Sequence, residues 1–171
     1  MAMKFRGLKS LEAKLKKIPA EARSAIKQAL AESADETVAT MKNLAPVSKT
    51  GSHGWEPGML RESIVATFGD GSTPKYAAFT ARKGRRRVKA ADPDLSVTIT
   101  AGNEDVRYAH LVEFGTAPHV NGGRFKGSQH PGTQAQPFFY PGYRANKKKA
   151  AARIKRAVKR GIQAAARGGS V

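Results

Sequence analysis

The chain has 171 residues and a mass of 18.3 kDa, a length typical of a single domain, which we expect over residues 1–171. Its 31 Lys and Arg residues against 13 Asp and Glu give a formal charge of +18, which predicts an anionic partner or neighbouring subunits that bury this charge. Cysteine is absent, which excludes disulfide scaffolds, thiol nucleophiles and cysteine-based zinc sites. The sequence has no apolar run of the kind that predicts a signal peptide or a membrane span. We therefore expect a soluble protein without a membrane partner.

Two amphipathic helices are predicted in the N-terminal part of the chain. Apolar residues recur at three- and four-residue steps over residues 19–45, which predicts one long helix. Pro19 suits its first turn, and Pro46 marks its end. A shorter apolar stripe predicts a second helix within residues 1–18, hinged to the first at Pro19.

A sheet region is predicted over residues 59–116. Three short runs have strand-like composition, at residues 63–68, 76–81 and 95–101, and apolar and polar residues alternate most clearly in the last one. Between the second and third runs, the loop 82–89 holds six cations in eight residues. So dense a charge predicts a solvated connection unless a polyanion orders it.

The C-terminal part is predicted to end in a basic helix. Residues 108–114 favour a short helix that Gly115 closes, and the composition of residues 117–136 is typical of a loop. A narrow apolar stripe over residues 142–167 predicts the terminal helix. From Arg144 onward the chain contains ten Lys or Arg residues and no acid, so the rest of this helix surface is basic.

The motifs of common enzymes are not found. The four histidines lack metal-ligand spacing, and neither a nucleophile elbow nor a phosphate-binding glycine loop is present. Glu113 stands alone among apolar neighbours, and we interpret it as a buried, hydrogen-bonded carboxylate with a structural role. We therefore predict a protein that is not an enzyme and has no metal, cofactor or catalytic residue. The enzymatic alternative is a metal-dependent nuclease that uses Glu113 with Glu104 or Asp105.

Two basic segments are candidates for contact with DNA or with an acidic protein surface, and the simpler alternative is a solvated basic face. No helix-turn-helix, zinc finger or RNA-binding signature is visible, so contact with nucleic acid is expected to be independent of sequence. The candidate contact residues are Arg82, Lys83, Arg85, Arg86, Arg87, Lys89, Lys147, Lys148, Lys149, Arg153, Lys155, Arg156, Lys159 and Arg160.

Three short segments, which we call blocks, have the composition of residues that pack in a core or form turns. They begin at Ala45-Pro46-Val47, at Tyr108 and at Gln136-Pro137-Phe138. We expect Tyr108, Phe114 and Phe138 to be core anchors. The residues assigned to packing and turns are Tyr108, Ala109, Val112, Glu113, Phe114, Gly115, Thr116, Pro137 and Phe138.

In this order the blocks resemble a neck or tail-completion family of tailed double-stranded-DNA phages, which is likened to the minor tail protein Z of phage lambda. Residues 108–116 match the family pattern Y-A-x-x-V-E-F-G-T throughout, and Pro137-Phe138 matches the Pro-Phe before its C-terminal helix. The first block departs, because residues 52–59 are inserted and carry Trp55, the only tryptophan. The resemblance implies an α+β subunit with a long N-terminal helix, a small, mainly antiparallel sheet and a C-terminal helix.

The resemblance also implies a structural virion protein that acts at the head–tail junction. Such a subunit is assembled in the host cytoplasm into a ring of six or twelve copies around the DNA channel. The partners it implies are the connector, the head-closure protein, the tail terminator or the tail tube, with non-specific contact to genomic DNA. A tail-terminator or head-closure role in the same neck remains an alternative. From another class, the alternative is a free, sequence-independent nucleic-acid-binding protein.

Overall fold

The structure, a computed structural model of the full chain, describes residues 20–49, 56–69, 71–77 and 92–168. In this part of the chain two long helices combine with short helices and two small antiparallel sheets, which confirms the predicted α+β class. The predicted helix within residues 1–18 and the basic loop 82–89 lie outside the described residues. The elements in chain order are α2 (Ala20–Leu44), α3 (Met59–Glu62), β1 (Val65–Phe68), η1 (Pro93–Leu95), β2 (Val97–Thr100), α4 (Ala109–Phe114), β3 (His119–Val120), η2 (Gly123–Phe125), β4 (Gln129–His130) and α5 (Phe139–Gly168).

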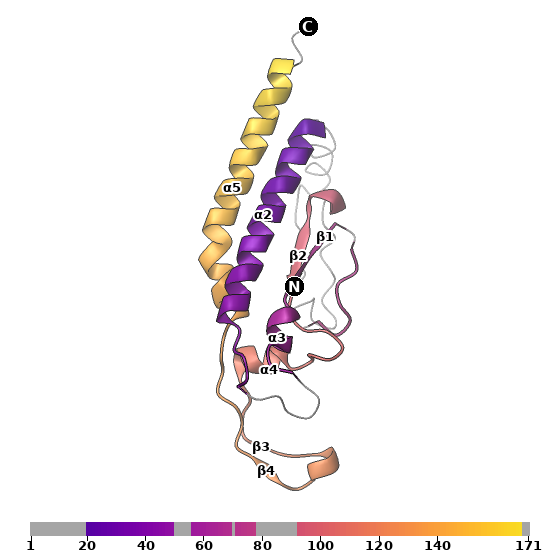
Figure 1. The fold of residues 1–171 in the computed structure, drawn as a ribbon, viewed down its shortest axis with the longest axis vertical. Helices are drawn as coiled ribbons and strands as arrows, with labels where there is room; N and C mark the ends of the chain where they lie inside the picture. The colour runs from indigo at the N-terminus through magenta and orange to yellow at the C-terminus, as the bar shows by residue number, and fades with distance from the viewer. Residues whose placement is uncertain (1–19, 50–55, 70, 78–91, 169–171) are drawn as a thin grey trace, which may run out of the picture.

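The two long helices, α2 and α5, lie side by side, and β1 and β2 lie on the other side of α2 in the view of Figure 1. α2 has 25 residues and confirms the helix predicted over residues 19–45. Its buried side chains include Ala22, Ile26 and Met41, which the three- and four-residue spacing places on one face. This predicted apolar face is the one that packs against α5.

Gly142 and Gly161 allow the backbones of α2 and α5 to approach closely. A Cβ atom at Gly142 would lie 2.6 Å from Cγ of Met41. A Cβ atom at Gly161 would lie 2.5 Å from Cβ of Ala22. Because carbon atoms pack at about 3.5–4.0 Å, no side chain fits at these two positions without movement of the partner helix.

Replacement of Gly161 by alanine is therefore expected to destabilise the protein, although alanine favours a helix over glycine by about 1 kcal/mol. The new methyl group would lie 2.6 Å from Cα of Ala22, and this atom moves only if α2 moves. Overpacking of this kind costs about 1–3 kcal/mol, so a net loss of about 1 kcal/mol is expected in urea unfolding. A variant at least as stable as the wild-type protein would contradict the close packing of the two helices.

The first sheet pairs β1 with β2 in antiparallel register, with Val65 opposite Thr100. Both strands are shorter than the predicted runs 63–68 and 95–101. The first run begins in the turn that follows α3, and the last residue of η1 occupies the start of the second run. Local hydrogen bonds of these turns therefore replace the ends of the predicted strands.

The predicted strand 76–81 lies largely outside the described residues. Its first two residues, Tyr76 and Ala77, are described and are not part of a strand. Tyr76 has a φ of 58°, a left-handed conformation that is incompatible with an extended strand. The prediction is therefore wrong for the part of the run that the structure describes.

The segment 117–136, predicted as a loop, contains a β-hairpin in the structure. β3 pairs with β4, with His119 opposite His130, and η2 lies at the tip. α5 is also longer than the predicted range 142–167, because it begins at Phe139. None of the helices in the described ranges is long and apolar enough to cross a membrane.

A hydrophobic core cluster lies where the C-terminal end of α2, the short helices and the start of α5 meet. Phe138 is fully buried there, at 0% exposure, and Tyr108 packs against the cluster while partly buried, which raises its pKa. These two residues occupy the positions expected of core anchors. The buried members of the cluster are Met41, Ala45, Leu60, Ile64, Ala101, Val106, Ala109, Phe138 and Phe139.

Candidate functional site

The carboxylate of Glu113 caps the N-terminus of α5 from another helix. Glu113 lies on α4 and is only 3% exposed. Its Oε2 accepts hydrogen bonds from the backbone N–H groups of Phe138, at 2.7 Å, and Phe139, at 2.8 Å. Its Oε1 accepts one from the N–H of Tyr140 at 3.0 Å. The first N–H groups of a helix have no partner within it, and the helix dipole favours an anion there. Glu113 is thus buried and hydrogen-bonded, as its interpretation as a structural carboxylate requires.

Gly115 and Thr116 complete the junction between α4 and the segment before α5. Gly115 has a φ of +70°, and a Cβ atom on it would lie 2.6 Å from the carbonyl oxygen of Thr133. The backbones of Thr116 and Thr133 exchange hydrogen bonds of 3.0 and 3.1 Å. The N–H of Gln136 also donates to the carbonyl of Val112 at 2.8 Å. Residues 112–116 therefore hold the segment that leads into α5 through backbone hydrogen bonds.

Phe114 is exposed, which corrects its prediction as a core anchor. It is 62% exposed, and its ring lies 6.0 Å from the ring of Tyr140, itself 40% exposed. The inward face of α4 holds Ala109 and Glu113. Neighbouring positions on a helix point about 100° apart, so the inward carboxylate of Glu113 turns Phe114 toward solvent. Phe114 and Tyr140 thus form an aromatic pair on the surface.

The hairpin between Thr116 and Thr133, which we call the hairpin arm, projects beyond the ends of the long helices (Figure 1). Cross-strand hydrogen bonds join Asn121 and Ser128, through the backbone at 2.8 Å and through the side chains at 2.9 Å. The imidazole rings of His119 and His130 stack with their centres 4.9 Å apart. The arm carries two large exposed hydrophobic side chains, Val120, 58% exposed, and Phe125, 67% exposed. The sequence did not single out either residue, because strands of two residues show no alternating pattern.

Two of the predicted basic contact residues form ion pairs with α2. Arg153 Nη2 lies 2.8 Å from Oε2 of Glu36, and its Nη1 donates to Oγ of Ser33 at 3.0 Å. Lys149 forms a further ion pair with Glu36. The hydrogen bonds from Lys149 and Arg153 lower the pKa of Glu36 from its usual value. These two residues therefore link the two long helices, and their contact with a partner stays a prediction.

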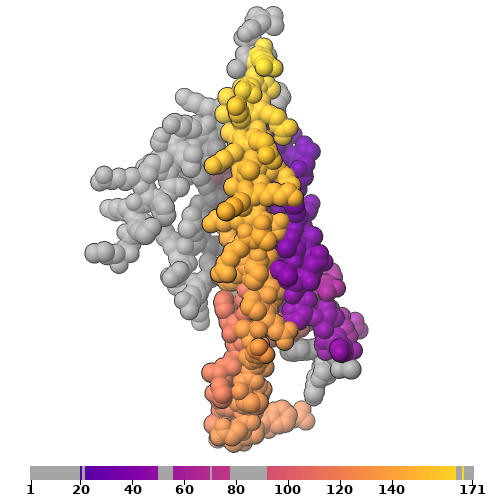
Figure 2. Space-filling model, turned by 90° about the vertical axis from the view of Figure 1, so that its left-hand side faces the viewer, coloured from indigo at the N-terminus to yellow at the C-terminus, as the bar shows by residue number. Residues whose placement is uncertain are grey.

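The other predicted contact residues of α5 lie on its surface. Figure 2 views the molecule from the side on which α5 runs in front, with side chains projecting along its length. Lys147 lies over the ring of Tyr143, 5.8 Å from its centre. The remaining members of the set are exposed, namely Lys148, Lys155, Arg156, Lys159 and Arg160. The six basic residues of the loop 82–89 lie outside the described residues, so their predicted contacts stay predictions.

A family model described as "Bacteriophage HK97-gp10, putative tail-component" matches residues 9–115, more than half of the chain. The chain belongs to this HK97-gp10-like family. Membership confirms the predicted relation to phage tail components and makes the protein a structural component of the virion. No curated protein and no solved structure shows a significant match. The matched range includes Glu113 and Gly115, whereas the hairpin arm and α5 follow it.

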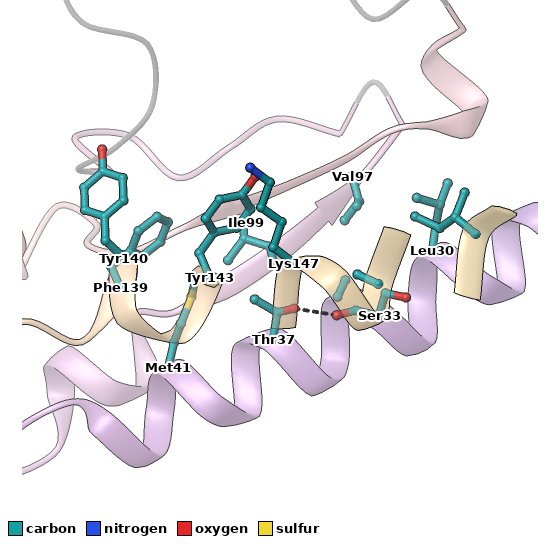
Figure 3. Close-up of a pocket in the computed structure, with 13 residues that line it drawn as sticks. Leu30, Ser33, Thr37, Met41, Val97, Ile99, Phe139, Tyr140, Tyr143 and Lys147 are labelled. Atoms are coloured by element: carbon teal, nitrogen blue, oxygen red, sulfur yellow. Dashed lines mark hydrogen bonds between the residues drawn. The ribbon is translucent and has the colours of Figure 1, made fainter. Parts of the chain in front are cut away.

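The HK97-gp10-like chain also has an apolar groove of about 410 Å³ between α2, α5 and β2. Figure 3 shows Leu30 and Met41 of α2, Tyr143 of α5 and Ile99 of β2 around it. The hydroxyl of Thr37, which faces the groove, donates to a backbone carbonyl of its own helix at 2.7 Å. The titratable side chains among the described residues that line the groove are Tyr140, Tyr143 and Lys147.

Two of the acidic residues that the nuclease alternative would use, Glu113 and Glu104, make other contacts in the part of the chain that the structure describes. Within the described ranges no group of three potential metal ligands is found. Both carboxylate oxygens of Glu113 already accept backbone hydrogen bonds, and Glu104 pairs with Lys75 at 3.5 Å on the surface. Membership in a family of structural tail components is consistent with a protein that is not an enzyme.

Proposed function

We propose that this tail component is a subunit of an oligomeric ring at the head–tail junction, where it completes the tail around the DNA channel. The observation that carries the proposal is the hairpin arm, which is ordered by its own hydrogen bonds and presents Val120 and Phe125 to solvent. Exposed apolar side chains on a projecting element mark a surface that another protein covers. In a virion component, the proposed partner is the next copy in the ring.

The shape of the molecule supports a head-to-tail contact between copies. The arm extends past the helical body (Figure 1), and we propose that its tip contacts a neighbouring copy at a surface different from the arm itself. Such heterologous contacts form a closed ring when the rotation from one copy to the next divides a full turn into a whole number of steps. The expected ring has six or twelve copies. Its other faces would bind the connector or head-closure protein on one side and the tail terminator or tail tube on the other.

The aromatic pair of Phe114 and Tyr140 is a second candidate contact surface. Both side chains are exposed; Phe114 lies at the end of α4, and Tyr140 lies in the first turn of α5. A rigid aromatic surface is typical of the anchors of protein interfaces. We assign it to contact with another neck protein. A tail-terminator or head-closure role would use the same surfaces, and only the partners would differ.

The arm is tested by replacing Phe125 with serine and measuring the mass of the purified protein. The wild-type protein is expected to form a closed ring of six or twelve copies. The Phe125→Ser variant should shift the ring equilibrium toward monomers by about 10-fold or more, because buried aromatic anchors contribute strongly to interfaces. The matched control is Tyr76→Ser, since Tyr76 is comparably exposed, at 61%, and lies outside the arm.

Two results would contradict the proposal. One is a wild-type protein that stays monomeric at high concentration and alongside its tail partners. The other is a Phe125→Ser variant that keeps the ring as well as the Tyr76→Ser control does. A monomer that binds DNA tightly and does not associate with particles would instead favour the alternative of a free nucleic-acid-binding protein.

A further inference from the structure

α5 carries a row of cations on the side that faces away from α2. The row consists of Arg144, Lys148, Lys155 and Lys159, which we call the outer cation stripe, and all four residues are exposed. At about 3.6 residues per turn, their positions fall within an arc of roughly 60°. The buried face of the helix, which includes Asn146, lies opposite.

The charges of the outer cation stripe are not neutralised within the described residues. In these ranges none of the four cations has a salt bridge, whereas Lys149 and Arg153, on the flank near α2, both pair with Glu36. α5 contains no Asp or Glu at all. The structure thus divides the basic residues of one helix into a set that holds the fold together and a set that is available for a partner.

We propose that the outer cation stripe binds the phosphate backbone of double-stranded DNA without reading its sequence. Arg144 and Lys159 are 15 residues apart, about 22 Å along the helix axis at 1.5 Å per residue. This length spans roughly seven phosphates of one strand, at about 3.4 Å per phosphate along the duplex axis. Three of the four cations are lysines, which act as flexible point charges on phosphates and lack the planar donor fork of arginine.

DNA suits the stripe better than an acidic protein surface does. The interfaces of proteins are enriched in aromatic residues and depleted in lysine, especially at their centres. Between Lys148 and Lys155 the outward positions are occupied by Ala151 and Ala152, both exposed and too small to anchor a protein contact. Phosphate contacts need only charge and access, and lysines separated by alanines supply both.

This inference rests on the proposed function only for where in the virion the protein would contact DNA. In the proposed ring, the stripe would face the channel through which the genome passes. Its binding to DNA is a property of α5 itself, and it is measurable whether or not a ring forms. Failure of the ring and failure of DNA binding are therefore separate results.

The test compares two triple variants of the full-length protein that lose the same charge. The stripe variant is Lys148→Ala, Lys155→Ala, Lys159→Ala. The control variant is Lys27→Ala, Lys49→Ala, Lys75→Ala, which removes three exposed cations from other parts of the chain. Lys27 and Lys75 form only surface ion pairs, with Asp94 and Glu104, so their loss should hardly change stability.

Binding is measured by fluorescence anisotropy with a labelled duplex of mixed sequence, and the oligomeric mass is measured on the same preparations. Each phosphate contact contributes about 0.9 to the salt slope, so the loss of three contacts should lower the slope by about 2.7. Between about 50 and 200 mM salt, the affinity of the wild-type protein should then fall roughly 40-fold more than that of the stripe variant. The control variant should retain the wild-type slope.

Two outcomes would overturn the inference. Equal loss of affinity in both variants would show that binding follows the net charge of the protein and not the stripe. A wild-type protein that forms its ring but does not bind the duplex would leave the stripe to an acidic protein partner. A monomeric protein whose DNA binding depends on the stripe would support the inference while contradicting the ring.

Discussion

Replacement of Glu113 by alanine is expected to lower the free energy of unfolding by about 3 kcal/mol. The change removes three hydrogen bonds to the N–H groups of Phe138, Phe139 and Tyr140, two of which lie in buried surroundings. Hydrogen bonds to a charged group contribute about 1.5–3 kcal/mol each, and loss of a helix cap alone costs about 0.5–2 kcal/mol. Partial access of water to Tyr140 reduces the total below the sum of these terms. Urea unfolding measures this difference.

Two further variants identify the cause of the loss. Glu113→Gln keeps the shape of the side chain but has only one acceptor oxygen, so we expect it to recover part of the stability. Glu104→Ala removes an exposed acid that only pairs with Lys75 on the surface, and its effect should stay within about 0.5 kcal/mol. If Glu113→Ala unfolds at the same urea concentration as the wild-type protein, the carboxylate does not support the start of α5.

The second large effect is expected from Phe138, in contrast with Phe114. Phe138 is fully buried at the centre of the core cluster, so Phe138→Ala should cost about 3–5 kcal/mol. Phe114 is 62% exposed, and its ring lies 6.0 Å from the ring of Tyr140, so Phe114→Ala should cost less than about 1 kcal/mol. The pair removes the same side chain from two sites, and thermal melting compares them directly.

The variants at Phe114 and Phe138 also distinguish an effect on stability from an effect on assembly. If Phe114 contacts a neck partner, Phe114→Ala should fold normally yet attach less well to particles. A result in which Phe114→Ala destabilises the protein as much as Phe138→Ala would contradict the orientation of α4. The inward position of Glu113 would then be wrong as well, since both follow from the same rotation of the helix.

The long helices could be predicted because their apolar residues recur over many turns. The helix predicted over residues 19–45 differs from α2 by one residue at each end. The start of α5 could not be predicted in the same way, because Glu113, 26 residues before Phe139, provides its cap. A contact that depends on the tertiary fold leaves no periodic signal next to the helix it stabilises.

The short helix predicted over residues 108–114 is confirmed by α4, but the prediction for Phe114 on its buried face was wrong, and the strands of the hairpin arm were missed. α4 has only six residues, and either of two faces could be buried: one with Leu111 and Phe114, the other with Ala109 and Glu113. Hydrophobicity favours the first face, but the hydrogen bonds of Glu113 to α5 select the second. The strands of the hairpin arm have two residues each, and the glycines and prolines around them are typical of a loop.

The basic residues of α5 could be found from composition, but their division into two sets could not. Lys148 and Lys149 are adjacent in the sequence, yet only Lys149 reaches Glu36 on α2. The position of each lysine relative to the helix interface decides whether its charge is used inside the chain. That position depends on how α5 is rotated against α2, which Gly142 and Gly161 fix by close approach.

The most direct test of the proposed role is electron microscopy of lysates from a phage or prophage that lacks this gene. Filled heads beside separate, finished tails are expected, because the protein is proposed to act where the two are joined. Overlong or unfinished tails would move it to the tail-terminator alternative. Normal, infectious particles would contradict a role at the head–tail junction.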